Sequence, residues 1–381
     1  MNETEEFMSF YDAIKRYAAF DFAGYNASVT PQQIESILDK DKLVPLDYLA
    51  LLSDAASSFL EPMAQRARSL TKKNFGNVMF LFTPLYISDH CDNGCPYCSF
   101  ARQHRIGRNH LSFEKIRAEA GTIAATGMRH LLVLTGESRS IASPEYIREA
   151  VSILSDSFSS VSIEVYPMTQ EEYSAMVASG ADGLTMYQEV YNEAKYHELH
   201  RGGPKDNYRF RLDAPDRAAS AGVRAVTVGA LMGLFEPRSE AFFTGLHAQY
   251  MQKTHPSVET SVAFPRLRPM VRDFEPYCKV SDRQYVQLLL AARLFLPRCG
   301  ITVSTRESKP FRNAIAPLGV TKMSAGVSTA VGGHAAGAVS TPQFDIADVR
   351  SLEEMKKDLV ALGFQPVLQD WNSGFLALRE K

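Results

Sequence analysis

From residue 78 onwards, short apolar or β-branched segments alternate with amphipathic segments of helix length. This alternation is typical of βα units and of a parallel sheet. The pattern predicts eight strands, at residues 78–86, 130–135, 161–165, 183–187, 223–229, 260–264, 301–304 and 320–324. Helices are predicted between them, for example at residues 113–125, 170–178, 282–296 and 349–362.

Eight such pairs fit a (β/α)8 TIM-type barrel, which takes about 250 residues. The span from residue 78 to residue 363 is close to that length. Several predicted helices end at a glycine such as Gly127 or Gly180, as a left-handed C-terminal cap prefers. A doubly wound open sheet is the alternative, but no glycine-rich dinucleotide loop follows the first predicted strand.

The segments outside this pattern divide the chain into three parts. Residues 1–76 contain apolar residues at helical spacing and are predicted to form an N-terminal helical extension. Residues 77–365 would form the barrel. Residues 366–381 would form a short C-terminal tail packed on the barrel, with Trp371 as a packing anchor.

The composition excludes several classes of protein. Hydrophobic residues make up 45% and charged residues 22% of the 381 residues, and the net charge is −2. This balance, with basic residues spread along the chain, argues against nucleic acid as the main partner. No apolar run approaches the roughly 20 residues that span a bilayer, and we see no secretory signal at the start. Five cysteines, three of them clustered, do not resemble a disulfide framework, so we expect a cytoplasmic protein.

The clustered cysteines are Cys91, Cys95 and Cys98, and they follow the first predicted strand. Structural zinc sites and ordinary iron–sulfur clusters take four protein ligands. Three thiolates therefore leave one metal position open for a ligand that is not protein. The alternative is a structural zinc site with His90 or His104 as the fourth ligand.

Polar side chains also follow most of the other predicted strands. Barrel enzymes place their active sites at the C-terminal ends of the strands, so we expect these side chains to meet at one rim. The residues at these strand ends are Glu137, preceded by Gly136, after the second strand, Glu164 at the third, Gln188 and Glu189 after the fourth, Arg266 and Arg268 after the sixth, and Ser304, Thr305, Arg306 and Glu307 after the seventh.

Each of these features also has a simpler interpretation. Gly136 could supply only a turn, and Glu189 could form a surface ion pair with Arg211. The two arginines after the sixth strand could be solvated charges on a proline-rich loop, and Arg306 with Glu307 could be a surface pair.

The segment from Cys91 to Cys98 resembles the Cx3Cx2C motif of the radical S-adenosylmethionine enzymes, including the aromatic Tyr97 before the third cysteine. Further segments resemble the tyrosine lyase family of thiamine biosynthesis, the 2-iminoacetate synthases. They are PLYIS at 84–88, LVLTGE at 132–137, YQEVY at 187–191, FPRLRP at 264–269, STRES at 304–308 and QDWNS at 369–373. The likeness covers essentially the whole chain.

This resemblance implies a [4Fe–4S] cluster on the three cysteines, with S-adenosylmethionine on its fourth iron. Tyr97 would lie near the adenine, and Gly136 and Glu137 would receive the methionine amino group. Glu164, Gln188, Glu189 and Arg211 would be further cofactor contacts.

The resemblance also implies a reaction. The Cα–Cβ bond of L-tyrosine would break to give 2-iminoacetate and p-cresol, with 5′-deoxyadenosine and methionine as co-products. Arg306, with Ser304 and Thr305, is our candidate for holding the tyrosine carboxylate.

The same family implies thiazole synthase as a protein partner, because it consumes the unstable imine, and a reductant of the flavodoxin or ferredoxin type. Two related lyases are alternatives, one acting on tyrosine in hydrogenase maturation and one acting on tryptophan. The first carries a second cysteine-bound cluster near its C-terminus, and this sequence has no cysteine after Cys299, so we do not expect it. A zinc-stabilised binding protein without catalysis is the alternative from another class.

Overall fold

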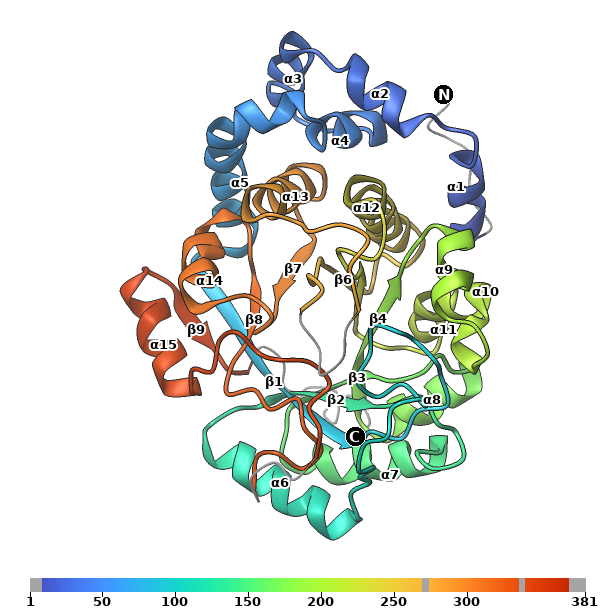
Figure 1. Cartoon of the computed structure of the whole chain (residues 1–381). Helices are drawn as coiled ribbons and strands as arrows, with labels where there is room; N and C mark the ends of the chain where they lie inside the picture. The colour runs from blue at the N-terminus through green and yellow to red at the C-terminus, as the bar shows by residue number, and fades with distance from the viewer. Residues whose placement is uncertain (1–8, 269–273, 336–339, 370–381) are drawn as a thin grey trace.

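A computed structural model of the chain describes residues 9–268, 274–335 and 340–369. Eight parallel strands form a closed barrel in which each strand pairs with the next along the chain and β8 and β2 both pair with β1 (Figure 1). The strands are β1 (Val78–Ser88), β2 (His130–Thr135), β3 (Ser160–Glu164), β4 (Ala181–Glu189), β5 (Ala225–Ala230), β6 (Glu259–Ala263), β7 (Gly300–Val303) and β8 (Lys322–Ser324). The predicted (β/α)8 barrel is therefore confirmed.

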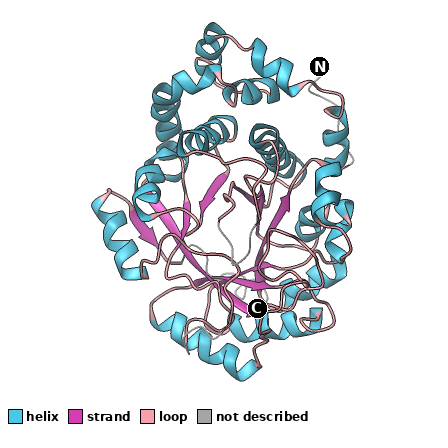
Figure 2. Cartoon of the chain, viewed as in Figure 1, coloured by secondary structure: helices cyan, strands magenta, loops and turns pink. Residues whose placement is uncertain are grey.

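Helices cover the outside of the barrel in the order expected of βα units (Figure 2). They are α6 (Phe113–Ala125), α7 (Pro144–Ser155), α8 (Gln170–Ala178), α9 (Glu193–Leu199), η2 (Pro204–Asp206), α10 (Tyr208–Leu212), α11 (Ala214–Ser220), α12 (Pro237–Thr254), α13 (Asp282–Phe295), α14 (Lys309–Ile315), η3 (Ala316–Leu318) and α15 (Leu352–Ala361).

Side-chain caps define where several of these helices begin. The side chains of Ser112, Ser143 and Thr169 accept hydrogen bonds from backbone N–H groups in the first turns of α6, α7 and α8. The predicted bounds of α6 and α8 match the observed ones. The last helix, α15, is shorter than predicted at both ends, because Ser351 caps it and Gly363 follows it with φ 83°.

One strand was not predicted. β9 (Gln365–Val367) pairs in parallel with Val78–Phe80 at the start of β1. The pairing of β1 with β2 begins only further along the strand, at Thr83. A strand of three residues around a proline carries no alternation that a sequence pattern could reveal. The boundary that we placed between residues 365 and 366 falls within this strand, and Trp371 lies outside the described residues.

The N-terminal segment is helical and lies outside the barrel, at the top of Figure 1. Its elements are α1 (Phe10–Arg16), α2 (Phe22–Ser28), α3 (Pro31–Leu38), α4 (Pro45–Leu51), η1 (Ala55–Phe59) and α5 (Leu60–Phe75). The ring of Tyr48 in α4 stacks on Phe295 of α13 with 4.6 Å between the ring centroids. This extension is thus packed against the barrel helices.

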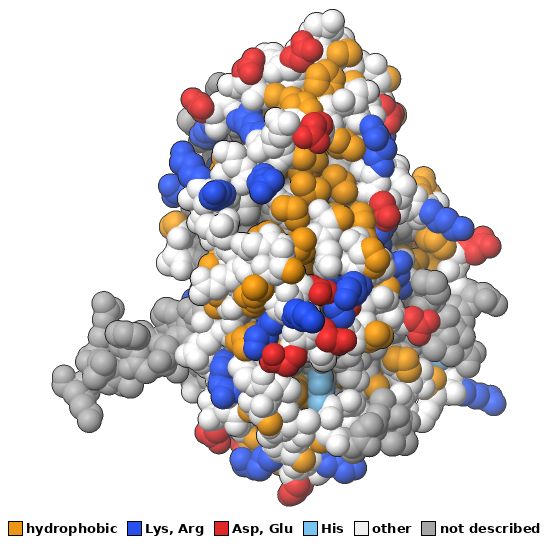
Figure 3. Space-filling model, turned by 90° about the vertical axis from the view of Figure 1, so that its left-hand side faces the viewer, with side chains coloured by type: hydrophobic (Ala, Val, Ile, Leu, Met, Phe, Trp, Pro, Cys, Tyr) orange, Lys and Arg blue, Asp and Glu red, His pale blue; other side chains and the backbone are white. Residues whose placement is uncertain are grey.

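Charges of both signs are interspersed over the side of the molecule shown in Figure 3. This distribution agrees with the sequence, in which the basic residues are spread along the chain. Among the described residues, no helix is long and apolar enough to cross a membrane.

Candidate active site

The residues that follow the strands meet around one cavity at the C-terminal end of the barrel. Its lining includes residues from each of the eight barrel strands or from the loop after it, and the three clustered cysteines are among them. The cavity is also lined by Tyr86, Tyr97, Glu137, Glu164, Tyr187, Glu189, Lys205, Arg211, Leu231, Pro265, Ser304, Thr305, Arg306, Ser324, Gln343 and Phe344.

The cysteines lie on the loop after β1, where Cys95 is buried and Cys91 and Cys98 are partly buried. Burial raises the pKa of Cys95 to about 12 and that of Cys98 to about 11, while the nearby Lys205 ammonium opposes both shifts. The Nδ2 of Asn93 lies 3.8 Å from the sulfur of Cys91, and the Nε2 of Gln343 lies 4.0 Å from that of Cys98. Burial therefore keeps the free thiols protonated, and they would lose their protons on binding a metal.

The donor set fits an iron–sulfur cluster better than a single ion. Within the described ranges, no three His, Cys, Asp or Glu side chains come together closely enough to hold one metal ion. In a [4Fe–4S] cluster each cysteine binds a different iron, so three thiols around one cavity do not need to converge on a point. The three cysteines therefore fit the cluster that the sequence motif implies.

Gly136 and Glu137 are joined to the cysteine loop. The backbone N–H of Gly136 donates to Ser88 at 2.8 Å, and a Cβ on Gly136 would press against the carbonyl group of His90. The Glu137 carboxylate accepts a 2.7 Å hydrogen bond from Asn93, and its backbone oxygen accepts one of 2.9 Å from Asp92. This segment is more than a turn, because it fixes one wall of the cavity to the loop that carries the cysteines.

Glu189 and Arg211 form a buried pair, not the surface pair that we considered. The Glu189 carboxylate lies 2.8 Å from the Lys205 ammonium and 3.7 Å from the Arg211 guanidinium. Burial alone would raise the pKa of Glu189, but Lys205 and Arg211 outweigh it and lower that pKa. Glu189 has φ 69°, which is rare for a residue with a side chain and is often found at functional sites.

Glu164 ends β3 and faces the same cavity. Burial, followed by the negative charge of Glu189, raises its pKa to about 7. No hydrogen bond or ion pair joins its carboxylate to another residue of the described part of the chain.

The ring of Tyr97 lines the cavity, and its hydroxyl group lies 2.7 Å from Nε2 of His200. Its position beside the cysteines is compatible with an adenine contact, which remains a prediction.

Gln188 is the one predicted contact that does not line the cavity. It lies between Tyr187 and Glu189, which both do, and neighbouring residues in a strand point to opposite faces. Both polar atoms of its amide are buried without a hydrogen-bond partner in the structure. The cofactor role that we predicted for Gln188 is therefore not supported by its position.

Arg306 projects into the cavity from the loop after β7. Its guanidinium lies over the ring of Phe344, 3.5 Å from the centroid, and burial lowers its pKa. Among the described residues, no carboxylate forms an ion pair with it. By contrast, the neighbouring Glu307 is buried and pairs with Arg266 and with Arg268, so the surface interpretations of these residues are wrong.

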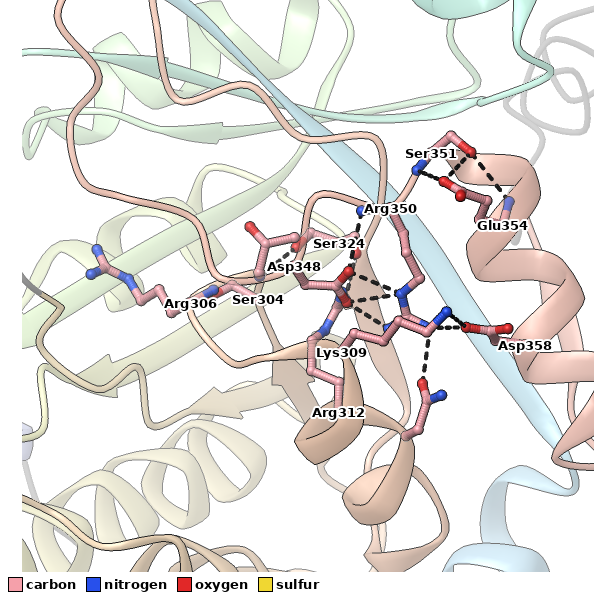
Figure 4. A network of polar contacts seen from close by, with 12 residues as sticks. Ser304, Arg306, Lys309, Arg312, Ser324, Asp348, Arg350, Ser351, Glu354 and Asp358 are labelled. Carbon is pink, nitrogen blue, oxygen red and sulfur yellow. Dashed lines mark hydrogen bonds and ion pairs between the residues drawn. The ribbon is translucent and has the colours of Figure 1, made fainter.

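A buried network holds the loop that carries Arg306 (Figure 4). The backbone oxygen of Thr305 accepts a 2.8 Å hydrogen bond from Ala347, and its N–H donates to the Ser324 hydroxyl at 3.1 Å. Arg312 joins the backbone oxygen of Ser324 to the carboxylate of Asp348, which Arg350 also contacts. Figure 4 shows Arg306 extending away from this network.

Sequence reasoning missed several residues of the cavity. Lys205 belongs to η2, far from any strand end, and Gln343 and Phe344 lie in the long segment between β8 and α15. Their sequence surroundings carry no motif, so only the folded chain reveals them.

Two family models match the chain. The model of the radical SAM superfamily matches residues 85–242, and that of the biotin and thiamin synthesis associated domain matches residues 263–365. A 2-iminoacetate synthase of Escherichia coli (strain K12) is 39% identical over 345 residues, which cover 90% of this chain and 92% of that protein. This chain belongs to the 2-iminoacetate synthase family.

Solved structures agree with this membership. HydG, a maturase of the [FeFe]-hydrogenase, superposes with a TM-score of 0.86 at 26% identity, covering 97% of this chain and 84% of that one. HydG from Carboxydothermus hydrogenoformans gives 0.81 at 28% identity, covering 94% and 82%. The present chain is a member of the radical SAM superfamily and therefore uses a [4Fe–4S] cluster and S-adenosylmethionine.

Proposed function

We propose that this chain cleaves the Cα–Cβ bond of L-tyrosine to 2-iminoacetate and p-cresol, with 5′-deoxyadenosine and methionine as co-products. The observation that carries the proposal is the pairing of two features in one cavity. Three cysteines suited to a cluster lie at one side, and an arginine without a carboxylate partner among the described residues extends from another. The identity with the E. coli 2-iminoacetate synthase supports the choice of reaction.

Cys91, Cys95 and Cys98 would hold the cluster. When bound, the cluster and S-adenosylmethionine supply a 5′-deoxyadenosyl radical that removes a hydrogen atom from the substrate, a chemistry that belongs to the cofactor. Gly136 and Glu137 are proposed to contact the methionine end of the cofactor, and Tyr97 its adenine. Glu189 and Arg211 complete the proposed cofactor contacts as a buried, mutually paired unit.

Arg306 is proposed to bind the tyrosine carboxylate. A guanidinium presents a planar fork of donors that matches a carboxylate and fixes its orientation. Ser304 and Thr305 hold the loop in place and line the cavity beside it. In this arrangement the protein orients tyrosine and keeps bulk water away from a reactive intermediate.

We further propose that the imine is passed to thiazole synthase for thiamine biosynthesis, because a free imine hydrolyses in water. A flavodoxin or ferredoxin would supply the electron.

The proposed function is tested by one anaerobic assay. The protein is reconstituted with iron and sulfide, reduced, and given S-adenosylmethionine with tyrosine or tryptophan. We expect a brown protein with broad absorbance near about 400 nm, and p-cresol and 5′-deoxyadenosine from tyrosine alone. A Cys95→Ala variant, treated in the same way, should form neither product.

Three outcomes of this assay would contradict the proposal. Indole products formed from tryptophan would show that tryptophan is the substrate instead of tyrosine. Formation of cyanide from tyrosine would place the chain with the hydrogenase maturases. A protein that stays colourless after reconstitution would show that no cluster forms, which would contradict the radical mechanism.

A further inference from the structure

Four glutamates line the cavity, and they differ in their surroundings. Glu307 is paired with Arg266 and Arg268. Glu137 accepts a hydrogen bond from Asn93, and Glu189 is paired with Lys205 and Arg211. The carboxylate of Glu164 has no hydrogen bond or ion pair with any other described residue, although it ends a barrel strand and faces the cavity. Glu164 is partly buried, and a carboxylate that loses contact with water without gaining a partner is unfavourable, so its position points to a partner that comes with a ligand.

Arg306 is the counterpart of Glu164 in the same cavity. Both side chains line it, and the Arg306 charge acts on Glu164 strongly enough to oppose the rise in its pKa. The guanidinium likewise lacks a carboxylate partner in the described part of the chain. An α-amino acid carries the complementary pair of charges, a carboxylate and an ammonium group joined through one carbon atom.

We propose that Glu164 receives the α-ammonium group of the substrate and accepts one proton from it. This inference rests on the proposed function, in which Arg306 binds the tyrosine carboxylate. One N–H bond of the ammonium breaks and one O–H bond forms on the carboxylate. The electron pair stays on nitrogen, and nothing is oxidised or reduced. The substrate then presents a neutral amine, from which a hydrogen atom is removed more easily than from a cation.

The electrostatic surroundings suit this transfer. Burial and the charge of Glu189 raise the pKa of Glu164 to about 7, well above the ordinary value for a glutamate and closer to the pKa of an amine. A carboxylate whose pKa is raised in this way is a stronger base than an ordinary glutamate and is better suited to take a proton from an ammonium group near neutral pH. The charged and titratable groups that face Glu164 are Tyr86 from β1, Tyr187 and Glu189 from β4, Lys205 from η2, Arg211 from α10 and Arg306 from the loop after β7.

The test is the pH dependence of p-cresol formation in the reconstituted wild-type enzyme and in Glu164→Gln. A base acts when it is deprotonated, so wild-type kcat/KM should rise with pH through a midpoint near 7. In Glu164→Gln, kcat/KM at pH 7 should fall by about 100-fold. It should recover only at higher pH, where the free amine of tyrosine loses its proton without help. Glu164→Asp should restore part of the activity at pH 7.

Two controls separate this role from others. Glu240→Gln changes another buried glutamate, whose pKa is about 8 and which lies outside the cavity lining, and it should leave the midpoint near 7 in place. Binding is measured by calorimetry with tyrosine and with 3-(4-hydroxyphenyl)propanoate, which has no amino group. Glu164→Gln should weaken the binding of tyrosine at least tenfold and that of the analogue less than twofold.

The proposal is overturned if Glu164→Gln keeps the wild-type pH profile. It is also overturned if the variant weakens the binding of S-adenosylmethionine and not that of tyrosine, since Glu164 would then be a cofactor contact. Because wild-type p-cresol formation is measured in the same series, a failure of the proposed reaction is distinguished from a failure of this role.

Discussion

At the scale of single residues, the proposal that tyrosine is the substrate depends most on Arg306. We expect Arg306→Ala to raise the KM for tyrosine by about 10- to 100-fold, because a charge-assisted hydrogen bond contributes about 1.5–3 kcal/mol. The absorbance of the cluster should not change, since no hydrogen bond or ion pair in the described part of the chain joins Arg306 to a cysteine. Steady-state kinetics of p-cresol release and the visible spectrum check both statements.

Arg306→Lys is the matched control. It keeps the positive charge but loses the planar fork, so its KM should fall between those of the wild type and the alanine variant. Loss of the cluster with unchanged tyrosine binding would show that Arg306 has a structural role instead.

The sequence reveals those site residues whose signal is local. The cysteine spacing, and the position of Glu137, Glu164 and Arg306 just after predicted strands, are enough to place them on one rim. We predicted Gln188 as a cofactor contact, but it does not line the cavity, because a one-residue step along a strand reverses the direction of the side chain. Lys205 could not be predicted, since it reaches the cavity from a short 3-10 helix.

At the scale of elements, Asp348 links α14 to the segment before α15. Its carboxylate contacts Arg312 and Arg350, and burial would raise its pKa, but these two arginines lower it to about 2. Because the folded-state pKa lies below the ordinary value, the stability from this carboxylate is present above about pH 4 and is lost only as the pH falls toward 2. The network is therefore fully charged in the pH range of the assays.

We expect Asp348→Asn to lower the free energy of unfolding by about 3–5 kcal/mol, because it leaves the buried Arg312 without a counter-charge. The loop at Thr305 should also lose its support, so the KM for tyrosine should rise while S-adenosylmethionine still binds. Denaturant titration, tyrosine kinetics and cofactor calorimetry measure these three effects.

Asp358→Asn offers a control in the same network. Asp358 also contacts Arg350, and it pairs with Lys309 at the surface. Its loss should cost less than about 1 kcal/mol and leave the KM unchanged. Equal effects of the two variants would contradict a special role for the buried carboxylate.

The elements differ in how well the sequence predicts them. Helices α6 and α8 were placed correctly because a capping Ser or Thr marks their start and apolar spacing marks their length. Strand β9 was missed because its three residues are specified by pairing with the start of β1 rather than by their own pattern.

At the scale of the whole molecule, the N-terminal extension is joined to the barrel through Tyr48. Its ring stacks on Phe295, and its hydroxyl donates to the backbone oxygen of Ala241 at 2.8 Å. The backbone of Leu51 and of Ser53 accepts hydrogen bonds of 2.9 and 2.7 Å from Gln287 of α13. The extension therefore contributes to the same core as the barrel helices.

Gly245 of α12 makes this junction testable, because the Tyr48 ring occupies the space where its side chain would be. A Cβ on Gly245 would lie closer than 3.0 Å to two ring carbons of Tyr48, whose ring is stacked on Phe295. We expect Gly245→Ala to destabilise the wild type, and Tyr48→Ala alone to cost about 3–5 kcal/mol. In the Tyr48→Ala background, Gly245→Ala should become neutral or stabilise by up to about 1 kcal/mol, since alanine favours a helix more than glycine does.

Tyr48→Phe keeps the ring and should not relieve the clash. Denaturant unfolding of the four proteins of this double-mutant cycle measures the coupling. Additive effects would mean that the extension and the barrel are not in contact at Tyr48.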